Sequence, residues 1–213
     1  MDILSSKIAT LGRRLPPEFF TLNAEKLAPQ LLGKVLVRVW ENHCLGGMIC
    51  ETEAYTEDDP ASHTFRGMNA RNRSMFATPG TMYVYQSYGI HWCLNIKSGV
   101  EGRGEGVLIR ALQPLYGQET MRKMRHLPQA KPEHELCNGP GKLTQALAID
   151  KRFDGLSINK ENIFLFEPSD KVLEQSALTR GPRIGISEGL DLMWRFALKK
   201  HPCLSKPFPA VRG

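Results

Sequence analysis

The feature that most constrains the fold is a pair of alternating segments between residues 34 and 55. Residues 34–40 (KVLVRVW) have the pattern that is typical of a β-strand. Residues 45–55 have the pattern of its partner, and the polar residues 41–44 form the expected turn between them. The two segments therefore predict an antiparallel strand pair.

Further strands are expected later in the chain. Residues 81–86 (TMYVYQ) and 90–96 predict a hairpin with Tyr88-Gly89 at its turn. Residues 106–112 (GVLIRAL) predict another strand, and short apolar runs at 163–166 and 183–186 predict two more.

Helical spacing is confined to a few segments. Asn23 can cap a short helix that runs to Leu32, with Gly33 as its stop. The spacing predicts further helices at 118–127 and 141–149, and at 187–198, although 194–198 fit an extended strand equally well. Residues 56–79 are expected to be mostly loop. Because the strands cluster and do not alternate strictly with helices, the pattern predicts an α+β fold with a largely antiparallel sheet.

Length and composition indicate one globular unit. The 213 residues suit a single domain with a buried core, and 41% hydrophobic with 23% charged residues is ordinary usage that disfavours disorder. The sequence contains no run of about eighteen apolar residues, the length that a membrane-spanning helix needs. Residues 1–15 lack a signal-peptide core and are expected to be loosely ordered. Five scattered cysteines favour reduced thiols in the cytosol.

The formal net charge of +6 is concentrated in one part of the sequence. Residues 61–125 contain nine lysine or arginine residues and three acidic ones, so the rest of the chain is neutral. The same segment contains Tyr83, Tyr85 and Tyr88. Basic residues interleaved with aromatic ones suit a groove that binds phosphates and stacks bases. The alternative is a solvated charged face beside an ordinary aromatic strand.

The sharpest local motif is ETEAY (51–55), at the end of the second alternating segment. Alternation places Glu51, Glu53 and Tyr55 on one face of the strand. A carboxylate near a strand end that faces an aromatic cavity is a candidate general base. The alternative is a pair of solvent-facing acids on an edge strand, which is the commoner setting for glutamate.

The tyrosines of the expected hairpin form a second motif. Tyr83 and Tyr85 share one face, and Tyr88 sits at the tip before a glycine. A rigid, exposed aromatic side chain can be inserted between base pairs as a wedge. Cross-strand packing is the alternative, and it accounts for Tyr83 better than for an exposed tip.

Other motifs are set aside on chemical grounds. GPGK (139–142) resembles a phosphate-binding loop, but Leu143 stands where serine or threonine is required. GRGEG (102–106) precedes a strand and opens no helix, so it is not a dinucleotide fingerprint. The scattered histidines and cysteines lack the paired spacing of zinc ligands, so no metal site is expected.

Seven blocks in order resemble one known family. They are ETEAY (51–55), ASH (61–63), RNRSMF (71–76), PGTMYVYQSYG (79–89), Asn95, LIRALQP (108–114) and NGPGKLTQALAI (138–149). Together they are similar to the alkyladenine, or 3-methyladenine (methylpurine), DNA glycosylases. The resemblance covers most of the chain and implies a single α+β domain over 1–213 with a curved, largely antiparallel sheet, peripheral helices and a protruding β-hairpin.

The resemblance also implies an activity. Such a protein is a monofunctional DNA glycosylase of base excision repair, without metal or cofactor. It flips alkylated or deaminated purines out of duplex DNA and hydrolyses the N-glycosidic bond, which leaves an abasic site. Its substrates would be 3-methyladenine, 7-methylguanine, hypoxanthine and ethenoadenine. It would act as a monomer on double-stranded DNA with damaged purines, in the bacterial cytoplasm or the nucleus of a eukaryote.

Roles for individual residues follow from their motif positions. Glu53 resembles the general base that activates water, and Arg110 the residue beside the substrate phosphate and that water. Tyr88 resembles the intercalating residue that fills the gap left by the flipped nucleotide.

The remaining positions resemble those of the base pocket and its surroundings. Tyr55 would stack on one face of the extruded base, with His63 and Tyr85 on the other. Asn95 resembles the residue that collides with the 2-amino group of guanine. Phosphate contacts are expected from Arg71, Arg73 and Lys142.

Two other functions remain open from the sequence. A non-catalytic RNA- or tRNA-binding module would share the basic and aromatic composition, but it needs no buried carboxylate. A metal-dependent nuclease would lose its activity in a chelator.

Overall fold

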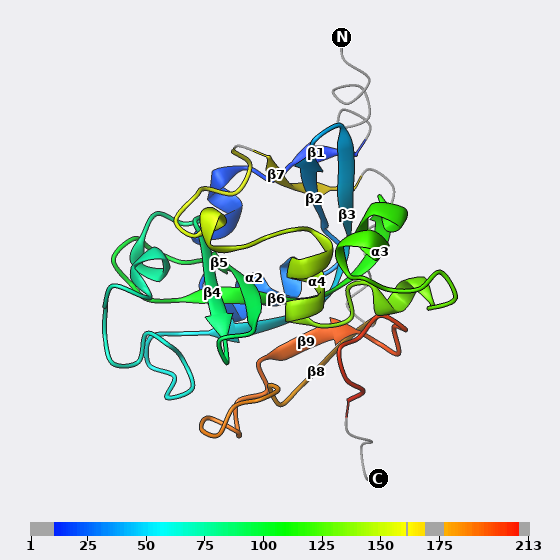
Figure 1. The fold of residues 1–213 in the computed structure, drawn as a ribbon. Helices are drawn as coiled ribbons and strands as arrows, with labels where there is room; N and C mark the ends of the chain where they lie inside the picture. Colours follow the sequence, from blue (N-terminus) through cyan, green and yellow to red (C-terminus); the bar gives the residue numbers. More distant parts are fainter. Residues whose placement is uncertain (1–10, 161, 169–176, 209–213) are drawn as a thin grey trace.

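The longest strand, β3 (His43–Tyr55), organises the computed structural model, which describes residues 11–160, 162–168 and 177–208. Nine strands of those residues form one sheet in the order β1-β7-β2-β3-β6-β5-β4, with β9 on β3 and β8 on β9. Every pairing between these strands is antiparallel. The α+β class with a largely antiparallel sheet is therefore confirmed (Figure 1).

The other strands flank β3 on both sides. Their bounds are β1 (Arg13–Arg14), β2 (Val35–Trp40), β4 (Met82–Ser87), β5 (His91–Lys97), β6 (Gly106–Tyr116), β7 (Ile163–Glu167), β8 (Leu178–Gly181) and β9 (Arg195–Leu198).

One edge of β3 is shared by two different strands. Its first part pairs with β2, from Trp40 opposite His43 to Val35 opposite Met48, and residues 51–53 pair with β9. Its other edge pairs with β6 along most of its length, with register irregularities between Ile49 and Thr52. Such irregularities bend a strand and re-aim its side chains. Because residues 51–53 pair with β6 on one edge and with β9 on the other, Glu51 and Glu53 lie in the interior of the sheet and are fully buried. The solvent-exposed edge alternative is therefore wrong.

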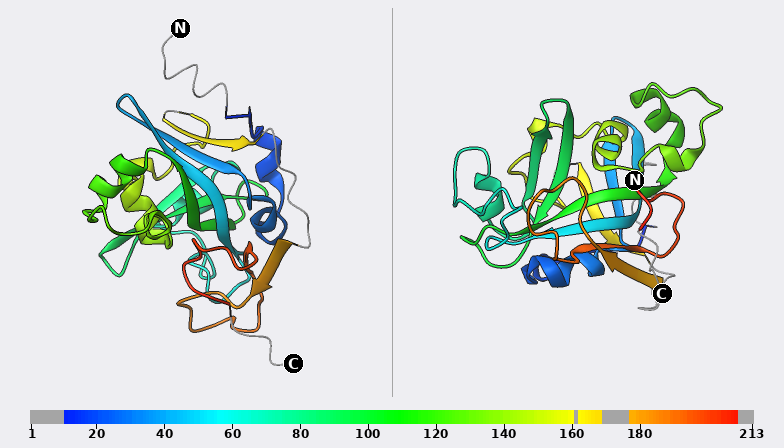
Figure 2. Two further views of the ribbon diagram at one scale, coloured as in Figure 1. Left: turned by 90° about the vertical axis from the view of Figure 1, so that its right-hand side faces the viewer. Right: turned by 90° about the horizontal axis from the view of Figure 1, so that it is seen from below.

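Helices cover both faces of the sheet. Helix α2 (Ala24–Gln30) lies on one face, and α3 (Gln118–Met124) and α4 (Pro140–Ala146) lie on the opposite one (Figure 2). The expected cap of α2 is confirmed, because the Asn23 side chain accepts a hydrogen bond from the Lys26 amide at 3.1 Å. Short 3-10 turns complete the connections: η1 (Pro17–Thr21), η2 (Arg73–Phe76), η3 (Glu133–Glu135) and η4 (Lys151–Phe153).

The core lies between the sheet and these helices. Apolar side chains of the strands, such as Ile49, Leu94 and Ile109, are fully buried in one cluster with Leu27 of α2 and Leu143 of α4. Cys50 and Ala54 point into that cluster, and Thr52 donates to the Ala28 carbonyl. The predicted alternation is thus confirmed: one face of β3 packs in the core, and the Glu51, Glu53 and Tyr55 face is left for polar contacts.

Several local expectations are wrong. Residues 183–186 form a loop and residues 187–194 form no helix, whereas 195–198 are the extended strand β9. The pairing of β9 with β3 outweighs the helical spacing of its side chains, which was only a local signal. His43 and Cys44 belong to β3, so the turn after β2 is shorter than expected. Helices α3 and α4 end at Met124 and Ala146, before the expected bounds.

The expectation of a loose N-terminal segment is also corrected where the structure describes it. Residues 1–10 lie outside the described residues. Arg13 and Arg14 form β1, which pairs with β7, and Leu15 is buried in the core. Residues 13–15 are therefore held by the sheet and the core.

The hairpin of β4 and β5 carries a tight turn at its tip. The Ile90 amide donates to the Ser87 carbonyl at 3.0 Å, and the two central residues, Tyr88 and Gly89, have φ of 51° and 69°. Positive φ at both positions is the left-handed region, which favours glycine and asparagine. Tyrosine in this conformation is strained, and its side chain is 87% exposed. No packing in the described part of the chain accounts for this residue.

Tyr88→Asn is expected to raise the stability of the folded chain. Asparagine tolerates the left-handed conformation that tyrosine adopts here at a cost, so the gain should be about 1 kcal/mol. Urea unfolding followed by circular dichroism measures it. A loss of stability would show that the tyrosine ring contributes contacts which the structure does not contain.

Candidate active site

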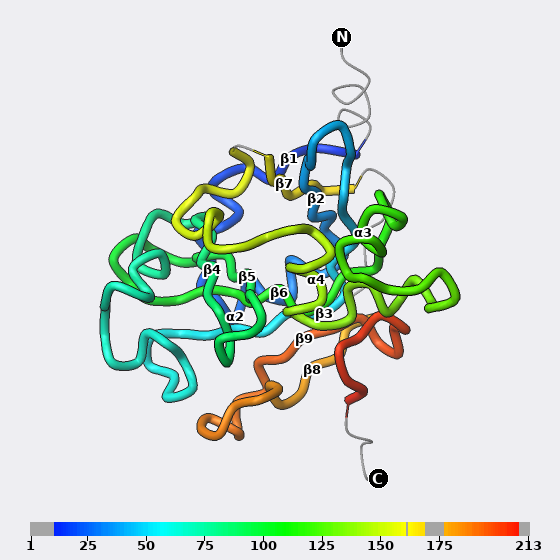
Figure 3. The backbone as a smooth tube through the Cα atoms, viewed as in Figure 1, coloured from blue at the N-terminus to red at the C-terminus, as the bar shows by residue number. Residues whose placement is uncertain are grey.

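A cavity of about 560 Å³ opens where three segments meet at one end of the molecule. The segments are the hairpin, the loop after β3 and the loop before β9, which lie on the same side in the tube drawing (Figure 3). The volume lies within the range of about 300–1,000 Å³ that small-molecule sites occupy. Its lining is Tyr55, residues 60–63, Arg71, Met75, Tyr83, Tyr85, Ser87, Tyr88, Cys93, Asn95, Leu108, Arg110, Pro140 and residues 184–188.

Glu53 lies directly behind the wall of this cavity. Its side chain is fully buried, and Oε2 accepts hydrogen bonds from the Tyr55 hydroxyl at 2.9 Å and from Arg110 Nη1 at 3.0 Å. Oε1 accepts one from the Ile184 amide at 2.7 Å. All three donor residues line the cavity. A carboxylate has about four acceptor positions, so these donors occupy most of them and fix the carboxylate in place.

Arg110 joins Glu53 to the second glutamate of the motif. Its Nε lies 3.3 Å from Glu51 Oε1, and Glu51 also binds Arg195 Nε at 2.7 Å and the Ser205 amide at 2.6 Å. Burial alone would lower the pKa of Arg110, but Glu53 and Glu51 outweigh that effect and raise the pKa. The guanidinium therefore presents a permanent positive charge at the cavity wall, and Glu51 holds it from behind.

Tyr55 is a neutral hydrogen-bond donor in this arrangement. Burial and, next, the charge of Glu53 raise the pKa of the Tyr55 phenol well above its ordinary value. The phenol thus keeps its proton at neutral pH and donates it to Glu53. Its ring lines the cavity, in agreement with the face predicted from the sequence.

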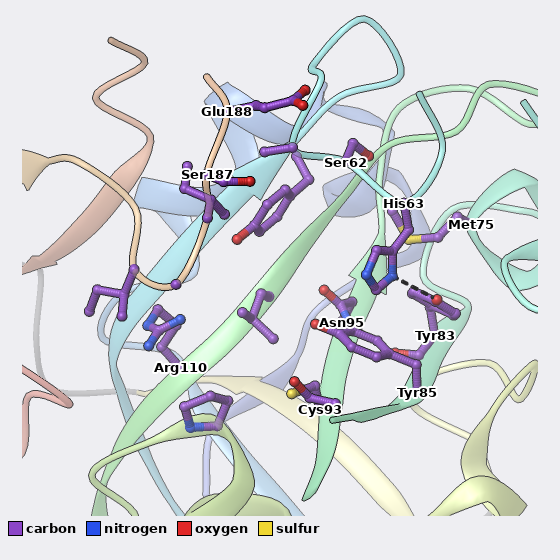
Figure 4. A pocket seen from close by; sticks show the side chains of 18 of the residues that line it. Ser62, His63, Met75, Tyr83, Tyr85, Cys93, Asn95, Arg110, Ser187 and Glu188 are labelled. Carbon is purple, nitrogen blue, oxygen red and sulfur yellow. Dashed lines mark hydrogen bonds between the residues drawn. The ribbon is translucent and has the colours of Figure 1, made fainter. Parts of the chain in front are cut away.

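Aromatic rings form the opposite wall. The Tyr83 and Tyr85 rings stack with centroids 5.2 Å apart, and the His63 ring meets Tyr85 edge-on at 4.5 Å. His63 Nδ1 lies 3.0 Å from the Tyr83 hydroxyl (Figure 4). Partial burial and, next, the charge of Arg71 lower the pKa of His63, so the imidazole is neutral at neutral pH. In the same view Arg110 lies across the cavity from these rings.

Most of the other predicted site residues also reach the cavity. Asn95 lines it, and its Nδ2 donates to the Tyr83 carbonyl at 3.2 Å. Tyr88 and Arg71 border it, with the Arg71 guanidinium 5.7 Å from the Tyr85 ring centroid. Arg73 and Lys142 are exposed and do not line it; Lys142 Nζ binds Asn138 at 2.8 Å.

The positive charge of residues 61–125 is not one surface patch. Lys97, Arg110 and Arg122 are buried. Lys97 and Arg122 donate to backbone carbonyls, and Arg103 pairs with Asp58 at 2.8 Å. The charge excess in the sequence therefore overstates what the folded surface offers to a polyanion.

Several residues of the site were not expected from the sequence. The cavity includes Tyr83, Cys93 and the loop 184–188, and Arg183 pairs with Asp59 directly behind Tyr55. Asp59 lies in a segment expected to be loop, and 183–186 was expected to be a strand. No local pattern could join positions more than a hundred residues apart.

Metal sites and membrane-spanning helices are both absent from the described residues. Among them, no group of three or more histidine, cysteine, aspartate or glutamate side chains could hold a metal ion. No helix of this part of the chain is long and apolar enough to cross a membrane. Cys50, Cys93, Cys137 and Cys203 are buried and form no disulfide.

Comparisons with known proteins agree on one family. A family model described as methylpurine-DNA glycosylase matches residues 18–202. A protein of Nitrosospira multiformis is 46% identical over 189 residues, covering 89% of this chain and 92% of its own. Relatives from Rhodopseudomonas palustris and Carboxydothermus hydrogenoformans are 44% and 43% identical, covering 94% and 90% of this chain and 94% and 98% of their own. All three have 3-methyladenine DNA glycosylase in their names.

The protonation of His63 provides a test of the cavity geometry. In a proton NMR titration from pH 4.5 to 8.5, we expect the His63 ring to titrate below its ordinary pKa of about 6.5. Arg71→Gln should raise the midpoint because it removes a nearby positive charge, but burial keeps it below the ordinary value. The His63 ring resonance is identified as the one that is absent from the spectrum of His63→Gln. An unchanged midpoint in Arg71→Gln would contradict the proximity of the two side chains.

Proposed function

The chain belongs to the methylpurine-DNA glycosylase family, and we propose that it excises 3-methyladenine and related damaged purines from duplex DNA. The observation that carries this proposal is the pairing of Glu53 with Tyr55, Arg110 and Ile184 at the wall of an aromatic cavity. The proposed substrates are alkylated or deaminated purines: 3-methyladenine, 7-methylguanine, hypoxanthine and ethenoadenine.

Access to the reacting bond requires that the base leave the helix. The glycosidic bond is hidden in stacked duplex DNA, and extrusion of a base costs a few kcal/mol. The exposed Tyr88 ring at the hairpin tip borders the cavity, so it can fill the gap when the base enters. Arg71, Arg73 and Lys142 are exposed and are proposed to contact the phosphates.

The cavity suits an electron-poor purine. Tyr55 would stack on one face of the base, and His63 and Tyr85 on the other. Aromatic faces attract a cationic ring by about 0.5–2 kcal/mol, and the neutral imidazole of His63 adds no opposing charge. The buried Asn95 is proposed to disfavour unmodified guanine, whose 2-amino group collides with it. For 7-methylguanine the attraction of the aromatic faces for its positive charge offsets that collision.

A cationic alkylated purine leaves as a neutral base, so its chemistry needs one carboxylate. A neutral purine such as hypoxanthine leaves as an anion and takes up one proton, which balances the proton lost by the attacking water. Departure of a purine leaves positive charge on the sugar, and the Glu53 carboxylate stabilises that charge while it takes a proton from the attacking water. Arg110 holds Glu53 in place and is proposed to lie beside the lesion phosphate. The products are the free base and an abasic site.

We propose that the protein does not cleave the DNA strand. A lyase reaction requires an amine nucleophile, and the residues that line the cavity in the described part of the chain include no lysine. We propose that the protein acts as a monomer, without metal or cofactor. We also propose that it works in the bacterial cytoplasm, and the bacterial source of the three relatives supports the bacterial part of this proposal.

A non-catalytic RNA-binding module is the weaker alternative. Burying a carboxylate is costly unless it is paired. A surface that only binds RNA has no use for Glu53 with a paired guanidinium beside a cavity of base size. The arrangement is explained when Glu53 takes part in a reaction.

Glu53→Gln is expected to abolish most base release. The amide cannot accept a proton from water, so single-turnover release of hypoxanthine or 7-methylguanine should fall by about 10²–10⁴-fold. The assay uses a lesion duplex with EDTA present and scores abasic sites by alkaline cleavage.

Matched measurements separate the outcomes. Glu119→Gln changes an exposed glutamate of α3 in the same way and should excise like the wild-type chain. Wild-type excision by Glu53→Gln contradicts the assigned base. Loss of wild-type activity in EDTA supports the metal-dependent alternative, and strand breaks without alkali contradict the absence of lyase activity.

Tyr88→Asn, the variant expected to gain stability, should lose function on duplex DNA. Without the ring to fill the gap, nothing offsets the free-energy cost of unstacking the base. Single-turnover excision should therefore slow about tenfold or more. A single strand with the same lesion has no partner strand to part from, so the variant should release its damaged base at nearly the wild-type rate. Equal losses on both substrates would contradict the wedge.

A further inference from the structure

Arg183 is a buried cation that the proposed reaction does not use. It follows β8, at the start of the loop that lines one side of the cavity, and its side chain is fully buried. A charge in such a position requires a partner, since removing it from water costs several kcal/mol. Its partner is Asp59, from the loop after β3, whose side chain is also fully buried.

The pair is bidentate and is tied to β3. Arg183 Nη2 donates to Asp59 Oδ1 at 2.9 Å, and Nη1 donates to Asp59 Oδ2. Nη1 also donates to the carbonyl of Ala54 at 3.0 Å, the residue between Glu53 and Tyr55. Such planar, two-point pairing fixes the guanidinium in orientation as well as in place.

The guanidinium stacks on the tyrosine of the site. Its central carbon lies 4.6 Å from the Tyr55 ring centroid and 5.5 Å from that of Trp194. Tyr55 lines the cavity and Arg183 does not, so Arg183 covers the ring face that is turned away from the cavity. The opposite face is the one on which a base would stack.

The same arginine is next to the residue that holds Glu53. Ile184, its neighbour in the chain, donates its amide to Glu53 Oε1 at 2.7 Å. Fixing Arg183 on Asp59 therefore fixes both the ring behind the base and one of the three donors to the carboxylate.

We propose that Arg183, paired with Asp59, is a positioning residue that sets the Tyr55 ring plane for base stacking. It touches neither base nor water, and it acts through Tyr55. This inference rests on the proposed function, because stacking on Tyr55 is part of it. A misplacement of about 1 Å can reduce a rate about 10²-fold, so this support is large enough to measure.

The test removes the support without leaving a buried charge. Asp59→Asn/Arg183→Met replaces both members of the pair by neutral side chains of similar size, which buried pairs often tolerate. Arg183→Lys is the second variant: it keeps the ion pair but loses the planar fork and the stacked guanidinium. Arg180→Met removes an exposed arginine of β8 and serves as the matched control.

Each variant is made in the wild-type chain and in Tyr55→Ala, and single-turnover release of 7-methylguanine from duplex DNA is measured. We expect the paired substitution to slow release about 10–100-fold in the wild-type chain, and less than about threefold in Tyr55→Ala. Arg183→Lys should follow the same pattern, and Arg180→Met should match its parent in both backgrounds.

Equal losses in the two backgrounds would overturn the proposal, because they assign Arg183 to the fold alone. Wild-type rates in both variants would overturn it as well. If the paired substitution does not fold, as judged by thermal melting, Arg183→Lys decides by the same comparison.

A binding measurement separates this proposal from the proposed function. Calorimetric binding of free 7-methylguanine is compared in the same set of variants. If the wild-type chain binds the base but releases none from DNA, the proposed function fails. The positioning role is then still decided by whether the affinity for the base depends on Arg183 when Tyr55 is present. No dependence of affinity on Arg183 would overturn that role.

Discussion

The fold depends on the neutralisation of charges buried at one end of β3. Three carboxylates from this strand and the loop after it meet three guanidiniums from later parts of the chain: Glu51, Glu53 and Asp59 with Arg110, Arg183 and Arg195. An unpaired charge at any of these positions would cost several kcal/mol, so each element that supplies a partner must be in place. The end of β3 consequently requires β6 on one edge and β9 on the other, and it requires the loop that follows β8.

The same constraint makes the cavity rigid. Glu53 accepts three hydrogen bonds from three different segments, and Tyr55 is held at its hydroxyl by Glu53 and on one ring face by Arg183. Donors that are fixed before the substrate arrives do not need to reorganise when charge develops, and this is the main advantage of a preorganised site. In this protein the paired charges that stabilise the folded chain also hold the residues that line the cavity.

Local patterns in the sequence could predict the part of this arrangement that lies on single strands. Period-two alternation places Glu53 and Tyr55 on one face of β3, and the turn residues Tyr88-Gly89 mark the hairpin tip; both predictions agree with the structure. The roles given to these residues stay predictions. Arg183 could not be found in this way, because its partners Asp59 and Ala54 lie more than 120 residues earlier. For the same reason the local pattern of residues 194–198 left helix and strand open: only the pairing of β9 with β3 makes this segment extended.

The distribution of charge leads to a different view of how DNA would be recognised. Binding through phosphates alone depends on the number of exposed cations and weakens steeply with salt. The segment that carries the whole net charge has three of its cations buried in the protein: Lys97, Arg110 and Arg122. The exposed field is therefore weaker than the sequence indicates. Under the proposed function, discrimination between damaged and normal DNA is assigned to the strained hairpin tip and the shape of the cavity. A protein of this kind would search DNA with modest affinity and hold firmly only where a base can leave the stack.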